Sequence, residues 1–350
     1  MPVAWIISGV IASLLVLPAL AVTITRLLPG DSLWWVILRA CTPVAIVPYT
    51  LAVIALVAMS HGLRGSARTT ASSALAAVVS LLILHVWWFA KPFLADAPGS
   101  ATDDGFVVMT ANLHIGRADP DAVLDAVDRH GVDVLVLVEV TPTALVELDE
   151  AGLGRRLGHR AGAAQPDRDG IMLFANNPLH DLTEIDTSSP GFGAEMTTSS
   201  GPLRILAVHP IAPNNGVAQW ANDLDVVVAA ARASHGPTMV AGDFNATLDH
   251  PQLQALMDSD YRDASADAGL GWRPTWPSSD NVRLISLRLP SLFGLDHVFI
   301  RGPLEATDAD VRAMPGSDHR ALVTRIAWTD SLDRAADQLP APPDADPAAR

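Results

Sequence analysis

The sequence has one cysteine, and it has no lysine beyond Lys91. Because Cys41 stands alone, the chain can form neither an internal disulfide nor a cysteine-based metal site. Residues 1–100 contain five basic and two acidic residues, which leaves 18 basic and 36 acidic residues for the rest. This excess of acid argues against tight, sequence-independent binding of duplex DNA, which depends on several contacts from Lys or Arg to phosphate. A simple acidic, soluble surface would give the same composition.

Charged residues are also scarce in the first part of the chain, which consists mainly of three long apolar runs. Residues 3–22, 33–59 and 71–90 each approach the roughly 20 apolar residues that a helix needs to cross a bilayer. The first run resembles a signal peptide in length, but it has no basic start and two further runs follow it. We therefore expect a membrane anchor of three transmembrane helices over residues 1–95 and a multi-pass location in the cell membrane.

Basic residues between the second and third runs indicate the orientation of this anchor. Arg64 and Arg68 lie in that loop without an acidic neighbour, and the positive-inside rule places such a loop in the cytoplasm. The large C-terminal domain would then be extracytoplasmic. Arg26 and Arg39 oppose this interpretation, because they lie on the other side or within a span.

The remainder of the chain alternates short apolar runs with helical patterns. Residues 96–105 form a polar linker, and residues 329–350, rich in Ala, Pro and Asp, predict a disordered tail. Between them, a continuous apolar stretch such as 134–138 indicates a buried strand, and apolar residues at helical spacing over 121–129 indicate a helix. The pattern predicts an α/β domain over residues 106–328, with helices covering its sheets.

Polar side chains stand at the ends of several predicted strands. Asn112 and Glu139 each follow an apolar run, and so does the sequence Gly-Asp-Phe-Asn at 242–245. Asp318 and His319 precede another run. Groups at the ends of core strands are held rigidly, which suits catalysis. Asparagines, carboxylates and histidines in such places are what a magnesium-dependent phosphoryl hydrolase needs.

Seven short motifs follow one another in this domain at strand ends. They are Thr110-Ala-Asn112, Leu137-Val-Glu139, Asp169-Gly-Ile-Met-Leu-Phe174, Val208-His-Pro210, Gly242-Asp-Phe-Asn-Ala246, Leu295-Asp-His297 and Gly316-Ser-Asp-His319. In this combination the chain resembles the endonuclease/exonuclease/phosphatase family, which includes DNase I-like nucleases, inositol-polyphosphate phosphatases and neutral sphingomyelinases. The resemblance implies an α/β (α+β) four-layer sandwich, in which helices flank two packed β-sheets, here preceded by the three transmembrane helices.

The resemblance also implies a divalent metal, Mg²⁺ or Mn²⁺, and residues that hold it. Glu139 resembles the metal-binding glutamate, Asp318 would lie near the metal as a ligand or through water, and Asn112 resembles the asparagine close to metal and phosphate. Carboxylate and amide oxygens suit a hard cation. Taken alone, Glu139 could be a strand-end carboxylate in solvent, and Asn112 could serve a turn.

Further roles carried over from the family concern the reaction itself. Asp243 and Asn245 resemble the pair that orients the attacking water and the phosphate. His319 resembles the histidine that contacts the scissile phosphate, and Asp296 the aspartate that fixes its ring. His209 resembles a second histidine that contacts phosphate or protonates the leaving group. Alone, a histidine after a strand is more often structural.

Two more residues are candidates for binding substrate. Arg168 could contact phosphate, although an exposed loop arginine is an equally good interpretation, and His114 could shape a substrate pocket. One departure from the family is the lack of tyrosine, since the domain contains only Tyr261. The phosphate-contacting tyrosine of the DNA-repair branch therefore has no obvious counterpart, which weakens a DNA-repair function.

Together these features predict a membrane-anchored phosphoesterase that hydrolyses a phosphodiester or phosphomonoester by in-line attack of an activated water. Its partners would be the lipid bilayer and a phosphate ester, either a lipid headgroup or extracellular nucleic acid. A non-catalytic binding or scaffold module on the same fold and a secreted-side nuclease remain alternatives. A transporter fits less well, because the spans contain only Arg39 as a charged residue.

Overall fold

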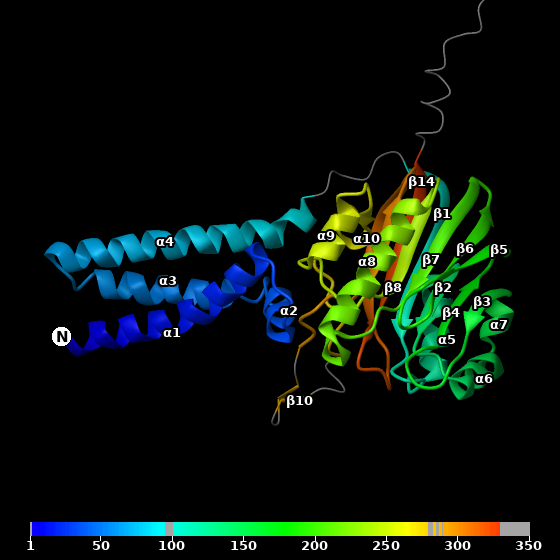
Figure 1. Cartoon of the computed structure of the whole chain (residues 1–350), viewed down its shortest axis with the longest axis horizontal. Coiled ribbons are helices and arrows are strands. Elements are labelled where there is room, and N and C mark those ends of the chain that lie inside the picture. The colour runs from blue at the N-terminus through cyan, green and yellow to red at the C-terminus, as the bar shows by residue number, and fades with distance from the viewer. Residues whose placement is uncertain (1, 95–100, 279–282, 285–286, 289, 330–350) are drawn as a thin grey trace, which may run out of the picture.

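The helical N-terminal part of the chain extends from one end of a β-sandwich (Figure 1). The computed structural model describes residues 2–94, 101–278, 283–284, 287–288 and 290–329. The predicted tail lies outside the described residues from position 330, and so do residues 96–100 of the linker predicted over 96–105. Residues 101–105 of that linker instead begin strand β1 (Ala101–Asn112), which pairs antiparallel with β14 (Arg320–Thr329).

Four α-helices and a short 3-10 helix make up the N-terminal part. They are α1 (Pro2–Leu27), α2 (Leu33–Ala40), α3 (Ile46–Ser60), α4 (Gly65–Ala90) and η1 (Lys91–Phe93). Helices α1, α3 and α4 pack side by side, whereas α2 lies at the end of this bundle that faces the sandwich (Figure 1).

Only two helices of the described chain are long and apolar enough to cross a membrane, namely Trp5–Leu27 and Gly65–Phe93. The prediction of one span over 33–59 is wrong, because a turn over 41–45 divides it into α2 and α3. Pro43 lies in this turn, lacks an amide donor and disfavours helical backbone in the residue before it. The 15 residues of α3 extend about 22 Å, less than the hydrocarbon core of roughly 30 Å.

The sandwich consists of two six-stranded mixed sheets. The first has the order β13-β14-β1-β2-β4-β3, and the second has the order β5-β6-β7-β8-β12-β9. The remaining strands of the first sheet are β2 (Val134–Val138), β3 (His159–Ala163), β4 (Ile171–Ala175) and β13 (Leu304–Ala313). Those of the second are β5 (Leu179–Ile185), β6 (Gly191–Thr198), β7 (Gly201–Val208), β8 (Thr238–Asp243), β9 (Arg262–Asp263) and β12 (Asp296–Arg301). A separate ribbon pairs β10 (Arg283–Leu284) with β11 (Leu287–Arg288).

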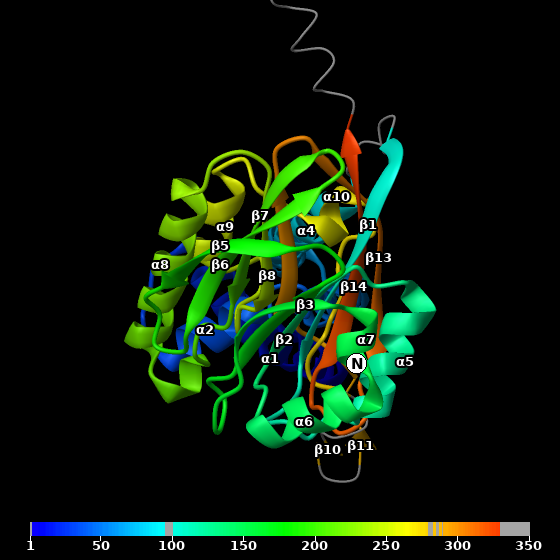
Figure 2. The same ribbon diagram turned by 90° about the vertical axis from the view of Figure 1, so that its right-hand side faces the viewer.

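Helices cover the outer face of each sheet (Figure 2). The first sheet carries α5 (Pro120–His130), α6 (Pro142–Ala151) and α7 (Leu153–Arg156), and the second carries α8 (Val217–Ala233) and α9 (Pro251–Met257). The short elements η2 (Pro213–Asn215) and α10 (Ala264–Asp267) complete the domain. The predicted arrangement of two packed sheets flanked by helices is therefore confirmed.

Strand β2 illustrates why the apolar runs are continuous. Val134, Val136 and Val138 pack into the core between the sheets, while Leu135 and Leu137 pack against the helices outside. Both faces of the strand are therefore out of water, as its unbroken hydrophobicity predicts. Glu139 directly follows this strand, where its apolar run ends.

Candidate active site

Three polar residues of the first sheet meet at one edge because of strand direction. Asn112 ends β1 and Glu139 directly follows β2, and these two strands are parallel, so their carboxyl ends coincide. His319 directly precedes β14, which runs antiparallel to β1 and therefore starts at that same edge.

The second sheet brings three more residues to the same end of the sandwich. His209 follows β7 and Asp243 ends β8, and these strands are also parallel. Asp296 starts the antiparallel strand β12 and is the register partner of Asp243. Gly242 is required for this approach: its φ is +150°, and a Cβ there would lie 1.9 Å from the Val208 carbonyl oxygen.

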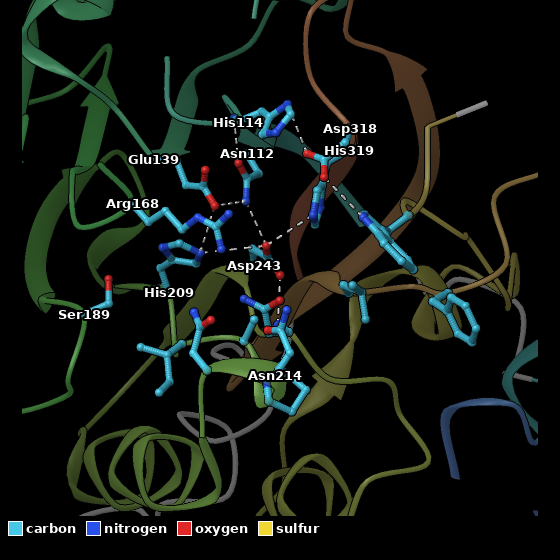
Figure 3. Close-up of a pocket in the computed structure, with 18 of the residues that line it drawn as sticks. Asn112, His114, Glu139, Arg168, Ser189, His209, Asn214, Asp243, Asp318 and His319 are labelled. Carbon is cyan, nitrogen blue, oxygen red and sulfur yellow. Dashed lines mark hydrogen bonds and ion pairs between the residues drawn. The ribbon is translucent and has the colours of Figure 1, made fainter. Parts of the chain in front are cut away.

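Asn112 links the two sheets through hydrogen bonds. Its Nδ2 donates to Asp243 Oδ2 at 3.0 Å and to Glu139 Oε1 at 3.2 Å, while its Oδ1 accepts from the His114 backbone at 2.8 Å. The amide oxygen is thus engaged away from the carboxylates, and the side chain presents a donor to them (Figure 3). This arrangement lets Asn112 orient Glu139 and Asp243, and its predicted place next to a metal stays a prediction.

Glu139 is held in an unusual backbone conformation. Its φ of 57° lies in the left-handed region, which costs a residue with a long side chain about 1–3 kcal/mol. Its side chain is buried, and Oε2 accepts a hydrogen bond from the Ile115 backbone at 2.8 Å. The surrounding structure therefore fixes one carboxylate oxygen of Glu139 and leaves Oε1 on the pocket side with Asn112.

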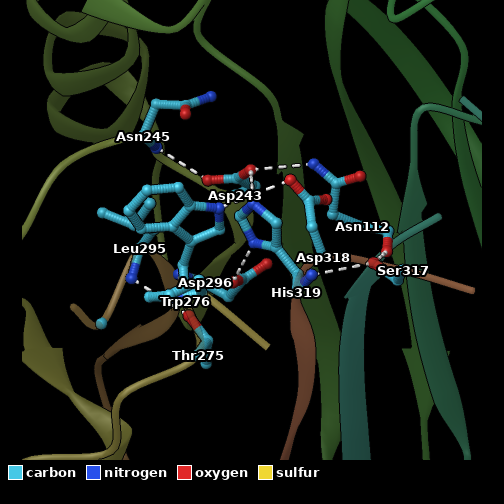
Figure 4. Close-up of polar contacts among 12 residues, drawn as sticks. Asn112, Asp243, Asn245, Thr275, Trp276, Leu295, Asp296, Ser317, Asp318 and His319 are labelled. Atoms are coloured by element: carbon cyan, nitrogen blue, oxygen red, sulfur yellow. Dashed lines mark hydrogen bonds and ion pairs between the residues drawn. The ribbon is translucent and has the colours of Figure 1, made fainter. Parts of the chain in front are cut away.

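His319 forms a buried pair with Asp296. The distance from Nδ1 to Asp296 Oδ2 is 2.8 Å, and Nε2 lies 3.6 Å from Asp243 Oδ2 (Figure 4). Burial alone would lower the pKa of His319, but the negative charges of Asp296 and Asp243 outweigh it and raise that pKa to about 10. The imidazole is therefore charged at neutral pH, with one nitrogen anchored and the other facing the pocket.

Two hydroxyl side chains hold this pair in place. Ser317 Oγ donates to the Asn112 carbonyl at 2.6 Å and accepts from the His319 backbone at 3.0 Å. Thr275 Oγ1 accepts from the backbone of Asp296 at 3.2 Å. Neither residue is predicted from the sequence to belong to the site. Ser317 lies inside one of the family motifs, whereas Thr275 carries no local signal, because it comes from a loop distant in the chain.

His209 lies between the two carboxylates on the pocket side. Its Nε2 is 3.9 Å from both Glu139 Oε1 and Asp243 Oδ2, and the ring is buried. Its Nδ1 has no hydrogen-bond partner among the described residues. Arg168 is exposed on its loop and points toward Glu139 and His209 (Figure 3). Both residues thus line the pocket, as their predicted contacts with substrate require.

Asn245 supports Asp243 through its backbone. Its amide N–H donates to Asp243 Oδ1 at 2.8 Å, and its side-chain Nδ2 donates to the Pro210 carbonyl at 3.1 Å. The φ of Asn245 is 49°, a conformation that asparagine tolerates better than most residues. This turn fixes one oxygen of Asp243 and leaves Oδ2 for the pocket.

Asp318 and His114 lie at the edge of this cluster. Asp318 Oδ1 is 3.6 Å from His114 Nδ1, and Trp276 Nε1 donates to Oδ2 at 3.5 Å. Both residues line the same pocket as the residues above, and its volume is about 910 Å³. The predicted site residues therefore all reach one pocket, with the exception of Asp296, which acts from behind His319.

The carboxylates of this pocket suit a hard divalent cation. Glu139, Asp243 and Asp318 supply oxygen donors, and Arg168 is the one Lys or Arg among the described lining residues. A second grouping, formed by Asp243, Asp296 and His319, has ligand atoms within 4.8 Å of one another. It is a poorer metal site, because His319 Nδ1 is already hydrogen-bonded to Asp296.

The domain is similar in sequence to known proteins. The sequence profile of the Endonuclease/Exonuclease/phosphatase family matches residues 109–319. Two UPF0294 proteins of Vibrio vulnificus, from strains YJ016 and CMCP6, are each 31% identical over 145 residues, which are 41% of this chain and 46% of the relative. The chain thus spans about half the length of the curated relatives that it matches.

Solved structures share the fold. D. rerio TDP2 in complex with a single-strand DNA product has a TM-score of 0.54 at 15% identity, covering 64% of this chain and 99% of that chain. An endonuclease/exonuclease/phosphatase from Beutenbergia cavernae has a TM-score of 0.51 at 17% identity, covering 65% and 72%. With a family match over more than half of its length, the chain belongs to the endonuclease/exonuclease/phosphatase family.

Proposed function

We propose that the protein is a membrane-anchored, divalent-metal-dependent phosphoesterase that hydrolyses a phosphodiester or phosphomonoester. The observation that carries the proposal is that Asp243 and His319 line the same pocket, with Asp296 hydrogen-bonded to His319 from behind. This hydrolysis needs a carboxylate that can accept a proton from water, which Asp243 supplies. It also needs a positive charge that can neutralise phosphate oxygens, which the charged His319 supplies.

In the proposed reaction, a water attacks phosphorus opposite the leaving oxygen. Asp243 Oδ2 orients this water and accepts its proton, because Asn245 and Asn112 hold the carboxylate in place. The charged His319 donates to a phosphoryl oxygen and stabilises the charge that develops there. As the phosphorus–oxygen bond breaks, the leaving oxygen takes a proton, for which His209 is positioned. The products are an alcohol and a phosphate with one ester bond fewer.

The proposal assigns Glu139 and Asp318 to the divalent cation, Mg²⁺ or Mn²⁺. Their oxygens fit such an ion, and members of this family typically use one. When bound, the cation would neutralise phosphate charge. Asn112 keeps Glu139 turned toward the pocket through its hydrogen bond to Oε1.

Exposed apolar side chains support the membrane anchor. Among the described residues, 22 large hydrophobic side chains are exposed, and all but Val146 and Leu182 lie within residues 1–94. Signal sequences share the length and composition of α1, but they do not account for such side chains on α3 and α4 as well. An apolar surface of this extent is stable against lipid and unstable in water.

The anchor also bears on the proposed extracytoplasmic position of the domain. Arg64 and Arg68 lie at the end of the bundle farthest from the sandwich, where α3 leads into α4 (Figure 1). The two opposing arginines have specific partners: Arg26 pairs with Asp249 at 3.0 Å, and Arg39 donates to the Thr25 and Leu28 carbonyls at 2.6 Å. Their positions are thus explained by structure, which leaves the far loop as the topological signal.

The two alternatives have less support. A scaffold module would not need a His–Asp pair whose free ring nitrogen faces a pocket, or a strained Glu139 beside it. A nuclease would need several cations along the nucleic-acid backbone, whereas Arg168 is the one arginine among the described pocket residues.

The test uses the purified full chain in detergent with a chromogenic phosphodiester and monoester. We expect hydrolysis with Mg²⁺ or Mn²⁺, loss of it in EDTA and its return when metal is added. Asp243→Asn should lower kcat/KM by about 10³-fold. The control His180→Asn changes an exposed histidine on β5 and should retain activity. Hydrolysis that persists in EDTA, or in Asp243→Asn, would refute the proposal.

A further inference from the structure

The pocket of the candidate active site has a second wall that comes from outside the family domain. Helix α2 contributes Leu33, Val36, Ile37 and Ala40 to the same pocket that contains Asp243 and His319. The family match covers residues 109–319, so this wall is an addition of the N-terminal part to the site.

Helix α2 is fixed to the domain by its inner face. Val36 is buried in the cluster that contains Trp220, Leu253 and Phe299 beneath the second sheet. His250 Nδ1 accepts from the Thr247 backbone at 2.9 Å, so its Nε2 carries the hydrogen and donates to the Val36 carbonyl at 3.2 Å. Burial lowers the pKa of His250 to about 4, which keeps the ring in this neutral form.

The rest of α2 offers no charge to a ligand. Its one charged residue, Arg39, is buried and donates to carbonyls at the end of α1. Trp34 is 73% exposed and Ile37 is 39% exposed. Such a helix, lying where the apolar bundle meets the polar domain, has the composition of a segment at a membrane surface.

Apolar side chains of the domain also line the pocket. Ile211, Pro213, Trp276 and Phe293 line it, and Arg168 is the one Lys or Arg among the described lining residues. A polyanion would find little to neutralise its additional charges here, whereas a single phosphate attached to an alkyl or acyl chain matches both the polar floor and the apolar walls.

We propose that α2 is a recognition wall for the hydrophobic chain of a membrane amphiphile whose phosphate ester is the substrate. The phosphate lies against Asp243 and His319, and the first carbons of the chain lie along Leu33, Val36 and Ile37. This inference rests on the proposed phosphoesterase function and names the substrate class of that same site.

The test compares methyl, hexyl and dodecyl p-nitrophenyl phosphodiesters with the full chain in detergent. A parallel series of methyl, hexyl and dodecyl phosphate monoesters is assayed by release of inorganic phosphate. Each methylene taken out of water by the wall is worth about fourfold. We therefore expect wild-type kcat/KM to be at least about tenfold higher for the dodecyl than for the methyl ester.

Two variants on α2 distinguish a preference for long chains that comes from contact with α2 from one that comes only from partition of the ester into micelles. Ile37→Asn removes a lining side chain and should lower the dodecyl-to-methyl ratio of kcat/KM about tenfold. Trp34→Asn changes an exposed residue that does not line the pocket and should leave the ratio within about twofold. Cleavage of the methyl ester with an unchanged ratio in Ile37→Asn would overturn the inference alone. Failure of the wild type to cleave any ester would overturn the proposed function.

Discussion

The two walls of the pocket differ in chemistry and in how they are held. The polar wall consists of side chains at strand ends, fixed by hydrogen bonds such as that from Asn112 to Asp243 at 3.0 Å. The apolar wall is α2. It is held by the burial of Val36, by one hydrogen bond from His250 to the Val36 carbonyl, and by the ion pair of Arg26 with Asp249. The first wall is specified within the family domain, and the second depends on docking between two parts of the chain.

Because the two walls are held differently, we expect the polar wall to serve bond breaking and the apolar wall to serve recognition of the chain. Groups fixed by hydrogen bonds within one domain keep the accuracy that bond breaking needs. A docked apolar helix distinguishes substrates by the apolar area that they bury against it. It tolerates small displacements, because hydrophobic contact has no preferred direction. Changes in the polar wall should therefore affect every substrate alike, and changes in the apolar wall should affect only substrates with a chain.

The largest effect is expected for His319→Asn. Loss of the charged imidazole removes stabilisation of the phosphoryl oxygens and should lower kcat/KM by about 10³-fold for methyl and dodecyl esters alike. Measurement of both esters with the full chain checks this. A loss confined to the dodecyl ester would break the distinction between the walls.

A second effect should distinguish the two neighbouring His–Asp pairs of the domain. His297 also bonds an aspartate, Asp263, at 3.0 Å, but its Nε2 meets the carbonyls of Ala246 and Gly294, so its ring is enclosed. Asp296→Asn should lower kcat by about 100-fold with little change in KM. Because Asp296 raises the pKa of His319, the variant should also lose activity at lower pH than the wild type does.

Asp263→Asn is the matched control for this experiment. It leaves a buried histidine with a weaker partner and should lower the free energy of unfolding by about 1–3 kcal/mol. Its activity per folded molecule and its pH profile should stay close to those of the wild type. If Asp263→Asn shifted the pH profile as Asp296→Asn does, the assignment of His319 as the histidine that acts on phosphate would be wrong.

The polar wall was largely predictable from the sequence. Asn112, Glu139 and Asp243 stand out because each ends an apolar run, and strand direction then brings them together. The orientation of the polar side-chain groups could not be predicted from the sequence. The Asn112 amide turns its nitrogen to the carboxylates because the His114 backbone takes its oxygen, and no sequence pattern records that bond.

The apolar wall could not be predicted, because its signal lies in tertiary contacts. Residues 33–40 are as hydrophobic as a span, and the break shows in the sequence only as Pro43, one of two prolines in a long apolar run. The docking partners of α2, such as Trp220 and His250, lie some 200 residues away in the chain and show no pattern that refers to it. The prediction of a single helix over 33–59 failed for this reason.

The smallest effect is expected where the two parts of the chain are joined. The pair formed by Arg26 and Asp249 is partly exposed, and such a pair contributes about 0–1 kcal/mol. Arg26→Gln and Asp249→Asn should each lower kcat/KM for the dodecyl ester up to about fivefold, because α2 is then held less firmly, and should leave the methyl ester unchanged. The double variant should resemble Arg26→Gln, which removes this pair and also the contact of Arg26 with the Trp88 ring. Asp128→Asn, which breaks an exposed pair with Arg156 on the outer helices, is the control and should change neither ester. An equal loss on methyl and dodecyl esters would mean that this joint supports the polar wall as well, and the two walls would no longer be separable.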